Sequence, residues 1–387
     1  MIHSTISVLS RIKFFALGII LILSFSQCKM YTAYHNIVSL QKENLCSEEK
    51  RTPRLEYVNS FPILHLYGTP SEMGQQYGTI LKKQLSSMVE LANELFPKKK
   101  IEKYIQDGEI AEKNLPEKFK IELKAMSEAS GVDYSTLLAL NMAPKATCST
   151  LAAWGKATAN GNLLMGRNAD YDFKKVNKAL GLIVVKHPSE GYATVTITFL
   201  GLIGGFSGIN ETGLCYGNML VYNGKNKITN LDGLPIQILM QWGGENDSSA
   251  NEMVDFLSNQ SHMVDNNVMC ADRTQALLIE LSHHQSKVRE GEEDLLVATN
   301  FFLSPELYNQ YEPCKRQTTI LKYSKKNYGT LTLTGMQKAM YLGRKKGSNL
   351  QCVIFEPETY KISVSMNKVP ASKGPFTELD IKKMVKD

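Results

Sequence analysis

The stretch Ala143–Asp172, "APKATCSTLAAWGKATANGNLLMGRNADYD", decides the fold that the sequence predicts. An apolar run begins at Cys148, an Asn-Gly pair follows at residues 160–161, and a second apolar run ends in "GRNADY". Two apolar runs joined by Asn-Gly are typical of a β-hairpin, because both central residues of its tight turn need positive φ. We therefore expect one hairpin to carry a cysteine on its first strand and charged residues at the end of its second.

Three reactive side chains converge in this hairpin. If residues 160–161 form the turn, the numbers of facing residues sum to about 321, so that Cys148 faces Phe173 and Asp170 lies three residues away. We expect the twist of the sheet to bring Arg167 close as well. Its guanidinium keeps its charge and favours the thiolate, which lowers the pKa of a thiol from its usual value of about 8.5. The sequence predicts that Cys148 is a nucleophile.

The hairpin contains no histidine that could act as a general base. If the Thr147–Cys148 bond is cut, however, Cys148 gains an α-amino group whose ordinary pKa of about 7.7–8.0 suits that role. Asp170 would then orient this amine. We therefore expect an inactive precursor that cleaves itself between Thr147 and Cys148.

The residues on the two sides of Cys148 differ in pattern. Before it, apolar residues recur at spacings of three and four over residues 73–95, and a second helix is predicted over residues 116–131. After it, short apolar runs punctuated by glycine predict strands that enclose a helical pair. The sequence predicts an α+β fold, with a helical segment over residues 57–147 and a strand-rich segment over residues 148–387, the two forming one domain.

The first 28 residues are typical of an export signal. Two basic residues precede the apolar run "FFALGIILILSF", which is shorter than the about twenty residues of a transmembrane helix. The following "FSQC" resembles a bacterial lipobox with Cys28 as the lipidated residue, and cleavage after Ser26 is the alternative. We expect an exported protein, held at a bacterial envelope membrane by a lipid on Cys28 or otherwise periplasmic or secreted. Residues 29–56 would be a polar tether.

Composition excludes several classes of function. The 387 residues are 43% hydrophobic and 21% charged, which is typical of a globular protein. The formal net charge is +6, but the basic clusters are short and lack interleaved aromatic residues, so we expect no nucleic-acid partner. The 7 cysteines form no Cys-x-x-Cys pair, so the common zinc patterns are absent and we expect neither a metal nor an organic cofactor.

Several segments carry a family resemblance. Around Cys148 and "GRNADY" stand, in order, "LYGTPSEMGQQYG", "SEASGVDYSTLLALN", "GINETGLCYGN", "GLPIQILM", "ATNFFLSPELYN" and "VPASKGPF". Together they resemble the cysteine N-terminal nucleophile (Ntn) hydrolases, which include bile-salt hydrolases, penicillin V acylases and acid ceramidase. The chain is most similar to the isopenicillin-N acyltransferase-like (acyl-CoA:6-aminopenicillanic acid acyltransferase) family, over residues 60–378. The resemblance implies an αββα sandwich with a helical N-terminal segment.

The resemblance also implies roles for individual residues. Cys148 would be the nucleophile of both self-cleavage and turnover, with Arg167 and Asp170 behind it. Asn300 would contribute to the oxyanion hole, and Arg316 falls where some relatives carry a second active-site arginine. Two further substrate or oxyanion candidates, the second of them favoured, are Asn210 and Asn218.

Two residues depart from the family pattern. Phe301 stands where a histidine is expected, which affects how Asn300 is held. Gln241 stands where many relatives carry arginine, which affects the substrate pocket.

These features predict a hydrolase that cuts the linear amide bond of an N-acyl compound through a thioester on Cys148. The α and β pieces would stay associated after self-cleavage. Transfer of the acyl group to an amine is one alternative, and a non-catalytic surface lipoprotein on the same fold is another. A papain-like site is a third alternative, since His283 and Asn300 follow Cys148 in the order that such enzymes use.

Overall fold

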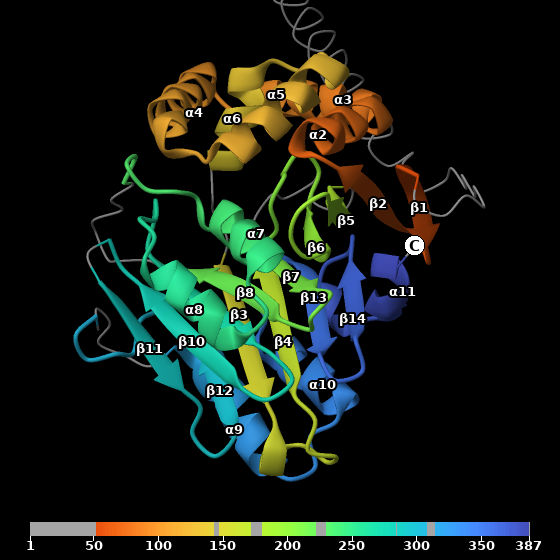
Figure 1. Ribbon diagram of the computed structural model, residues 1–387. Coiled ribbons are helices and arrows are strands. Elements are labelled where there is room, and N and C mark those ends of the chain that lie inside the picture. The colour runs from red at the N-terminus through yellow and green to blue at the C-terminus, as the bar shows by residue number, and fades with distance from the viewer. Residues whose placement is uncertain are drawn as a thin grey trace, which may run out of the picture.

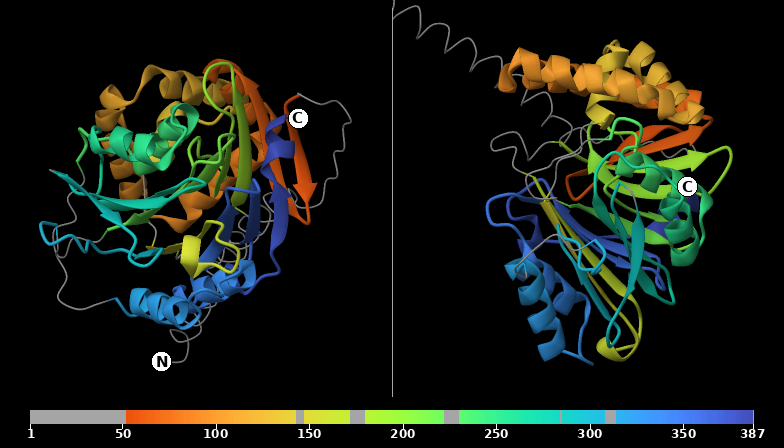
Figure 2. Two further views of the ribbon diagram at one scale, coloured as in Figure 1. Left: turned by 60° about the horizontal axis from the view of Figure 1, so that its bottom comes forward. Right: turned by 90° about the vertical axis from the view of Figure 1, so that its left-hand side faces the viewer.

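The computed structural model describes residues 52–142, 147–171, 180–221, 230–283, 285–307 and 314–386. Within these ranges the chain forms two facing β-sheets with helices on the outer side of each (Figure 1; Figure 2, right). This is the αββα sandwich that the sequence predicts. Cys28 and residues 29–51 of the expected tether lie outside the described residues. No helix in the described ranges is long and apolar enough to cross a membrane.

The larger sheet has nine strands among the described residues. In spatial order they are β1 (Arg54–Val58), β2 (Phe61–Gly68), β5 (Gly181–Pro188), β6 (Thr194–Phe199), β7 (Ser207–Asn210), β8 (Cys215–Leu220), β9 (Asn266–Ala271), β10 (Ala276–Leu281) and β11 (Ser286–Glu290). β1 pairs with β2 and takes up residues 54–56, so the expected tether is wrong for those three residues. β2 pairs in parallel with β5. Residues before Cys148 therefore add two strands to a sheet whose other strands come after Cys148.

The smaller sheet carries the predicted hairpin. In spatial order its strands are β12 (Leu295–Ala298), β3 (Thr147–Ala153), β4 (Leu164–Asp170), β13 (Asn349–Glu356), β14 (Lys361–Met366) and β15 (Thr377–Asp380). All neighbouring strands in it are antiparallel. Apolar side chains from this sheet and from the larger one meet between the two sheets in a single buried cluster.

The register of the β3–β4 hairpin differs from the expected one. Cys148 faces Ala169, so the facing numbers sum to 148 + 169 = 317 instead of about 321. The reason is a longer connection, because residues 155–157 form a 3-10 turn before Gly161 adopts φ 82°. The difference moves Cys148 away from the expected partner Phe173 and toward Arg167, which faces Thr150.

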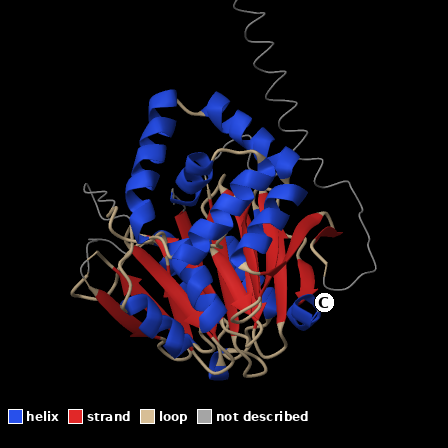
Figure 3. Cartoon of the chain, turned by 45° about the horizontal axis from the view of Figure 1, so that its top comes forward, coloured by secondary structure: helices blue, strands red, loops and turns tan. Residues whose placement is uncertain are grey.

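Helices cover both sheets. The described helices are α2 (Pro70–Ile80), α3 (Lys82–Leu95), α4 (Lys98–Ala111), α5 (Glu117–Ser130), α6 (Tyr134–Met142), α7 (Ile236–Asn246), α8 (Ala250–Ser258), α9 (Lys315–Lys326), α10 (Leu333–Gly343) and α11 (Ile381–Lys386). Residues of α2, α5, α7 and α8 form one buried cluster with the larger sheet, and α9 and α10 pack on the outer face of the smaller sheet. Figure 3 shows the helices gathered around the strands.

The helices before Cys148 begin and end at residues with clear physical roles. Thr69 caps α2 in a reciprocal capping box with Glu72, and Gly131 closes α5 with φ 77°. The single helix expected over residues 73–95 is wrong, since Leu81 (φ −106°, ψ 19°) separates α2 from α3.

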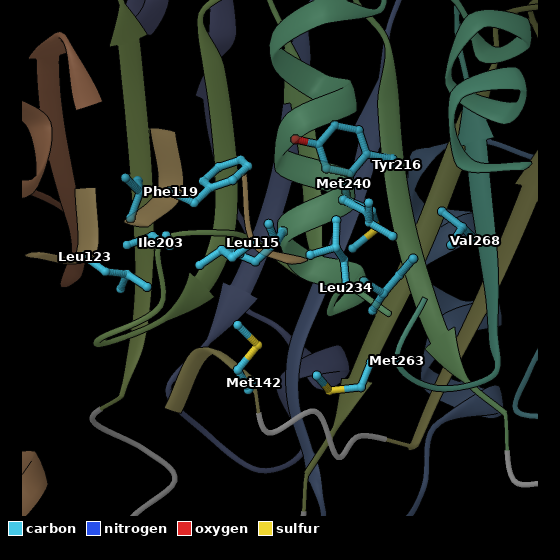
Figure 4. Packing of buried hydrophobic residues seen from close by; sticks show 14 of the residues in the cluster. Leu115, Phe119, Leu123, Met142, Ile203, Tyr216, Leu234, Met240, Met263 and Val268 are labelled. Atoms are coloured by element: carbon cyan, nitrogen blue, oxygen red, sulfur yellow. The ribbon is translucent and has the colours of Figure 1, made fainter. Parts of the chain in front are cut away.

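α2 and α5 approach each other closely because of a glycine. A Cβ at Gly74 would lie 2.1 Å from the carbonyl oxygen of Glu122, which is too close for any other residue. The same buried cluster contains Phe119 and Leu123 of α5, Met240 of α7 and Val268 of β9 (Figure 4). The helical N-terminal segment is therefore part of the same folded unit as the strands that follow it.

Candidate active site

Cys148 lies near the start of β3, inside the molecule. Its side chain has 0% exposure and belongs to the apolar cluster between the two sheets. Successive residues of a strand point to opposite faces. Cys148 and Arg167 therefore share the face toward the larger sheet, whereas the Asp170 side chain points to the layer of α9 and α10. The thiol, guanidinium and carboxylate lie at the same end of the β3–β4 hairpin. The first two are on the inner face of the sheet and the carboxylate is on the outer face.

Arg167 contacts the thiol directly. Its Nη2 lies 3.0 Å from Cys148 Sγ, and the same nitrogen donates to the carbonyl oxygen of Asn218 at 3.0 Å. Nε donates to that carbonyl as well, at 3.3 Å, so the guanidinium is held in place. Arg167 is 1% exposed, and its Nη1 has no hydrogen-bond partner among the described residues. This leaves one buried cationic donor beside the thiol for a substrate oxygen.

Burial and charge act on the thiol in opposite directions. Burial raises the pKa of Cys148 above its ordinary value, while the positive charge of Arg167 lowers it and the negative charge of Asp170 raises it. A backbone hydrogen bond from Asp170 to the thiol also favours the thiolate. Since burial wins in the uncut chain, the thiol there is protonated at neutral pH and needs a base before it can attack.

Asn300 and Arg316 hold the backbone of Cys148. The Cys148 N–H donates to Asn300 Oδ1 at 3.0 Å, and Arg316 Nη2 donates to the same oxygen at 2.6 Å. Arg316 Nη1 donates to the Cys148 carbonyl at 2.9 Å. Arg316 is in the first turn of α9 and Asn300 follows the end of β12, so two distant segments fix the backbone of Cys148.

Asp170 accepts hydrogen bonds from three sides. Its carboxylate accepts from Arg316 Nη1 at 3.2 Å, from the Lys345 N–H at 3.1 Å and from Asn349 Nδ2 at 2.9 Å. Burial raises the pKa of Asp170 to about 6, although Arg316 opposes this. The expected role of Asp170, to orient the α-amine of Cys148 after cleavage, stays a prediction for the uncut chain. That nitrogen bonds to Asn300 instead, because Asp170 lies on the other face of the sheet.

The residue before Cys148 is also held. The Thr147 hydroxyl donates to the carbonyl oxygen of Asp170 at 3.0 Å, and Thr147 faces Asp170 across the hairpin. Residues 143–146 lie outside the described ranges. The Thr147–Cys148 peptide bond is thus placed by β4 on one side and by Asn300 and Arg316 on the other.

The two candidate asparagines have different surroundings. Asn218 accepts from Arg167 through its carbonyl oxygen, and its Nδ2 donates to Asn266 Oδ1 at 3.0 Å. Asn210 belongs to a turn, where its Nδ2 donates to the carbonyls of Gly244 and Asp247 at 2.9 and 2.8 Å and its Oδ1 accepts from the following backbone. Both polar atoms of the Asn210 side chain are used there, so the structure gives Asn210 a part in the turn and shows no contact with Cys148 among the described contacts.

The papain-like alternative finds no support. His283 lies beside Asp265, with 3.7 Å between Nε2 and Oδ1, and its ring stacks on His262 with 6.1 Å between centroids. Neither interaction joins it to Cys148, and Asn300 bonds to the Cys148 backbone rather than to an imidazole. Gln241, the second departure from the family pattern, bonds to Thr194 and Glu245 within the α7 layer.

Sequence reasoning missed several polar residues around this site. Asn266 and Asn267 begin β9, and Asn349 begins β13; all three are buried and bond to site residues or to the chain beside them. The signal that could have found the first two is "DNNVMC", two adjacent asparagines at the start of an apolar strand. Among the described residues, no group of three or more His, Cys, Asp or Glu side chains is placed to bind a metal ion.

The αββα fold, with Cys148 at the start of a hairpin strand beside Arg167, Asp170 and Asn300, is the arrangement that the resemblance to cysteine Ntn hydrolases implies. A family model described as acyl-coenzyme A:6-aminopenicillanic acid acyl-transferase matches residues 157–369, more than half of the chain. The chain therefore belongs to this acyltransferase family. The match includes Arg167, Asp170, Asn300 and Arg316 and begins nine residues (157 − 148) after Cys148.

Relatives and solved structures are similar over parts of the chain. Protein dcd1B of Dictyostelium discoideum is 34% identical over 43% of this chain and 39% of its own length, and protein dcd1A of the same organism is 26% identical over 59% and 57%. The chain thus spans about half the length of these relatives. An N-acylethanolamine-hydrolyzing acid amidase ortholog from Caenorhabditis elegans has a TM-score of 0.44 at 18% identity, covering 54% of this chain and 93% of its own. A conjugated bile acid hydrolase from Clostridium perfringens has a TM-score of 0.44 at 14% identity, covering 62% and 94%.

Proposed function

We propose that the protein is a self-cleaving cysteine amidohydrolase that acts on the amide bond of an N-acyl compound. The observation that carries this is the arrangement at Cys148, whose thiol contacts Arg167 at 3.0 Å while its backbone N–H and carbonyl are held by Asn300 and Arg316. A structural cysteine in an apolar core needs none of these contacts. Cys215 lies in the same cluster, and among the described residues the side-chain partner of its thiol is the sulfur of Met165 at 3.8 Å.

Self-cleavage would convert the buried residue into a working nucleophile. Cys148 Sγ attacks the Thr147 carbonyl carbon, the thiol proton passes to the departing nitrogen of Cys148 as the Thr147–Cys148 C–N bond breaks, and the acyl group of Thr147 is carried on sulfur as a thioester. Water then hydrolyses the thioester, which leaves a carboxylate on Thr147 and a free thiol and α-amino group on Cys148. The new amine has an ordinary pKa near neutral pH and can accept the thiol proton.

Turnover would repeat the chemistry on an external amide. The amine takes the proton from Sγ, the thiolate attacks the substrate carbonyl, and the amine product leaves with that proton. Water releases the acid from the thioester and restores the enzyme. Arg167 Nη1 and Asn300 Nδ2 are the groups that can donate to the carbonyl oxygen as charge develops on it.

The acyl group of the substrate would be apolar. Tyr171, Phe199 and Phe206 pack edge to face, with centroids 5.2 to 6.1 Å apart, in the same apolar cluster as Cys148. The guanidinium of Arg167 lies 6.0 Å from the Phe206 ring. Apolar side chains on the thiol face favour a hydrocarbon or aromatic acyl chain over a polar one. Transfer of the acyl group to an amine instead of water is the second candidate, favoured by the name of the family that the chain matches.

Export and anchoring at a membrane are part of the proposal. The apolar run before Cys28 and the "FSQC" sequence support a lipid on that cysteine. A Cys28→Ser variant should then leave the membrane fraction of the producing cells, while Cys46→Ser should stay in it. If both variants fractionate like the wild type, Cys28 is not the anchor.

The test of the central proposal is intact mass and N-terminal sequencing of the purified wild type beside Cys148→Ala and Cys215→Ala. The wild type and Cys215→Ala should divide into two chains, one of which begins "CSTLAAWG", and Cys148→Ala should stay whole. The divided protein should then release acid from a panel of N-acyl amides that includes penicillin V. An undivided wild type, or a Cys148→Ala variant that divides as well, contradicts the proposal.

A further inference from the structure

We propose that Asn267 is a positioning residue that fixes Asn300 for both self-cleavage and turnover. This inference rests on the proposed function of Cys148 and Asn300. Asn267 is the second residue of β9 in the larger sheet, whereas Asn300 follows β12 in the smaller one. The side chain of Asn267 therefore acts across the interface between the two sheets, at the place where the nucleophile lies.

Asn300 can work only if its amide plane is fixed. Its Oδ1 accepts from the Cys148 N–H and from Arg316, and its Nδ2 donates to the carbonyl oxygen of Leu220. A side-chain amide has two N–H groups, so the second remains for a carbonyl oxygen that is under attack at Sγ. A rotation of the Asn300 backbone would turn this donor away from the reacting atom.

The strand itself does not hold Asn300. β12 ends at Ala298, and its ladder with β3 ends at the pair Ala298–Thr150. Beyond this pair, Asn267 holds the backbone. Its Nδ2 donates to the carbonyl oxygen of Thr299 at 3.0 Å and to that of Phe301 at 2.8 Å. These two carbonyls flank Asn300 on both sides. One fully buried side chain thus fixes the backbone before and after the oxyanion donor.

This contact also gives an account of Phe301, where the family pattern has a histidine. Phe301 contributes its backbone carbonyl to this contact, so the contact does not depend on the side chain at position 301.

A second side chain holds the chain further along. Glu280 accepts from the backbone N–H groups of Leu303 and Ser304, each at 2.9 Å, and pairs with Arg289 at 2.7 Å. Glu280 is buried but bonds to neither neighbour of Asn300. Because this anchor remains when Asn267 is replaced, variants of Asn267 should keep the segment in place and change mainly the orientation of Asn300.

The test compares Asn267→Leu and Asn267→Asp in the full chain, with self-cleavage followed over time during cell-free synthesis. Leucine removes both hydrogen bonds, and cleavage should slow by about tenfold to hundredfold at every pH. Aspartate turns a donor into a carboxylate that repels two carbonyls. It should cleave as slowly as leucine near pH 8 and recover as the pH falls, because a protonated carboxyl can donate to one carbonyl again.

The matched control is Asn210→Asp. Asn210 is also a buried asparagine whose amide donates to two carbonyls, but it lies in the turn that contacts α7. This variant should lose stability, but its self-cleavage should run at the wild-type rate at every pH. Wild-type rates in both Asn267 variants, or the same pH dependence in Asn210→Asp, would overturn the inference.

Failure of the proposed function gives a different result. In that case the wild type stays whole, and the crystal structure of Asn267→Leu decides the question. Asn300 should lose its contacts with the Cys148 N–H and Arg316 in this variant. If Asn300 keeps both contacts there, Asn267 does not position it.

Discussion

Arg316 Nη1 lies 3.2 Å from Asp170 Oδ2, and the Asp170 side chain has no exposure to solvent. Arg316 is its cationic partner across the gap between α9 and the smaller sheet. A buried carboxylate left without its cation is strongly unfavourable, because burial removes its hydration. The pair therefore connects the stability of this layer to the placement of Cys148, whose carbonyl the same guanidinium binds.

Removal of Arg316 should be costly, and the cost should depend on Asp170. In a Cys148→Ala background, which would keep the chain uncut, Arg316→Met should lower the free energy of unfolding by about 2–4 kcal/mol; this is below the loss for a fully buried pair, since Arg316 is 19% exposed. Urea unfolding measures this. Asp170→Asn combined with Arg316→Met should lose less than the sum of the single changes. Strict additivity would mean that the pair is not coupled.

Asp170 should make stability fall as the pH rises. Its pKa is about 6 in the folded chain against an ordinary value of 3.8, so between these values the folded state binds more protons than the unfolded state. The contribution of this group is therefore greatest below about pH 4 and decreases up to about pH 6, by roughly 3 kcal/mol. The difference in unfolding free energy between Cys148→Ala and Cys148→Ala/Asp170→Asn isolates it. A difference that grows with pH would contradict the assignment.

Arg167 should control the ionisation of the thiol. Arg167→Met removes the charge 3.0 Å from Sγ and should raise the pKa of Cys148 further, because burial then acts without opposition from that charge. The ultraviolet absorbance of the thiolate during a pH titration, taken as the difference from a Cys148→Ser partner of each protein, measures the shift. Arg273→Met, which removes a guanidinium stacked near Tyr360, should leave the titration unchanged. A downward shift in Arg167→Met would contradict the role given to Arg167.

Glu122 and Lys186 should hold the two pieces together after cleavage. Glu122 is on α5 and Lys186 on β5, 2.6 Å apart, with side-chain exposures of 3% and 1%. Lys186→Met leaves the carboxylate buried alone and should destabilise the protein by about 3–5 kcal/mol. Size-exclusion chromatography in increasing concentrations of urea should show the two pieces separating at a lower urea concentration than in the wild type.

The exposed pair Lys325–Glu293 supplies the control for that experiment. Lys325→Met should behave like the wild type, because exposed ion pairs contribute little. If both variants separate at the same lowered urea concentration, the buried pair has no special part in the association.

The hairpin and the layer order could be predicted from the sequence, because both follow from patterns that are local. Alternation and an Asn-Gly pair indicated two strands around residue 160, and the change of period at Cys148 indicated helices before strands. The register was off by four in its sum because the 3-10 turn at residues 155–157 has no strong local signal. The division of the expected helix at Leu81 was missed for the same reason.

The placement of site residues could be predicted only in part. Cys148, Arg167 and Asp170 lie within one hairpin, so local geometry brought them together. Asn300 was indicated by the family resemblance alone, and its Oδ1 accepts a hydrogen bond from the Cys148 N–H. The contact of Asn267 could not be predicted, because its partners are backbone carbonyls 32 and 34 residues away. Any residue type can supply a backbone carbonyl, so the sequence does not mark the partner.

The partners of the Cys148 backbone come late in the chain. Asn300 follows it by 152 residues and Arg316 by 168, and the strand β13 that flanks β4 is later still. A ribosome must therefore release the chain at least through Arg316 before these contacts can hold the scissile bond. Under the proposed mechanism, self-cleavage would occur only in chains that have completed folding. Truncated or misfolded chains would keep the bond intact, and their thiol would lack the α-amino group that serves as its base. Activity would then appear only in molecules that had already passed this conformational check.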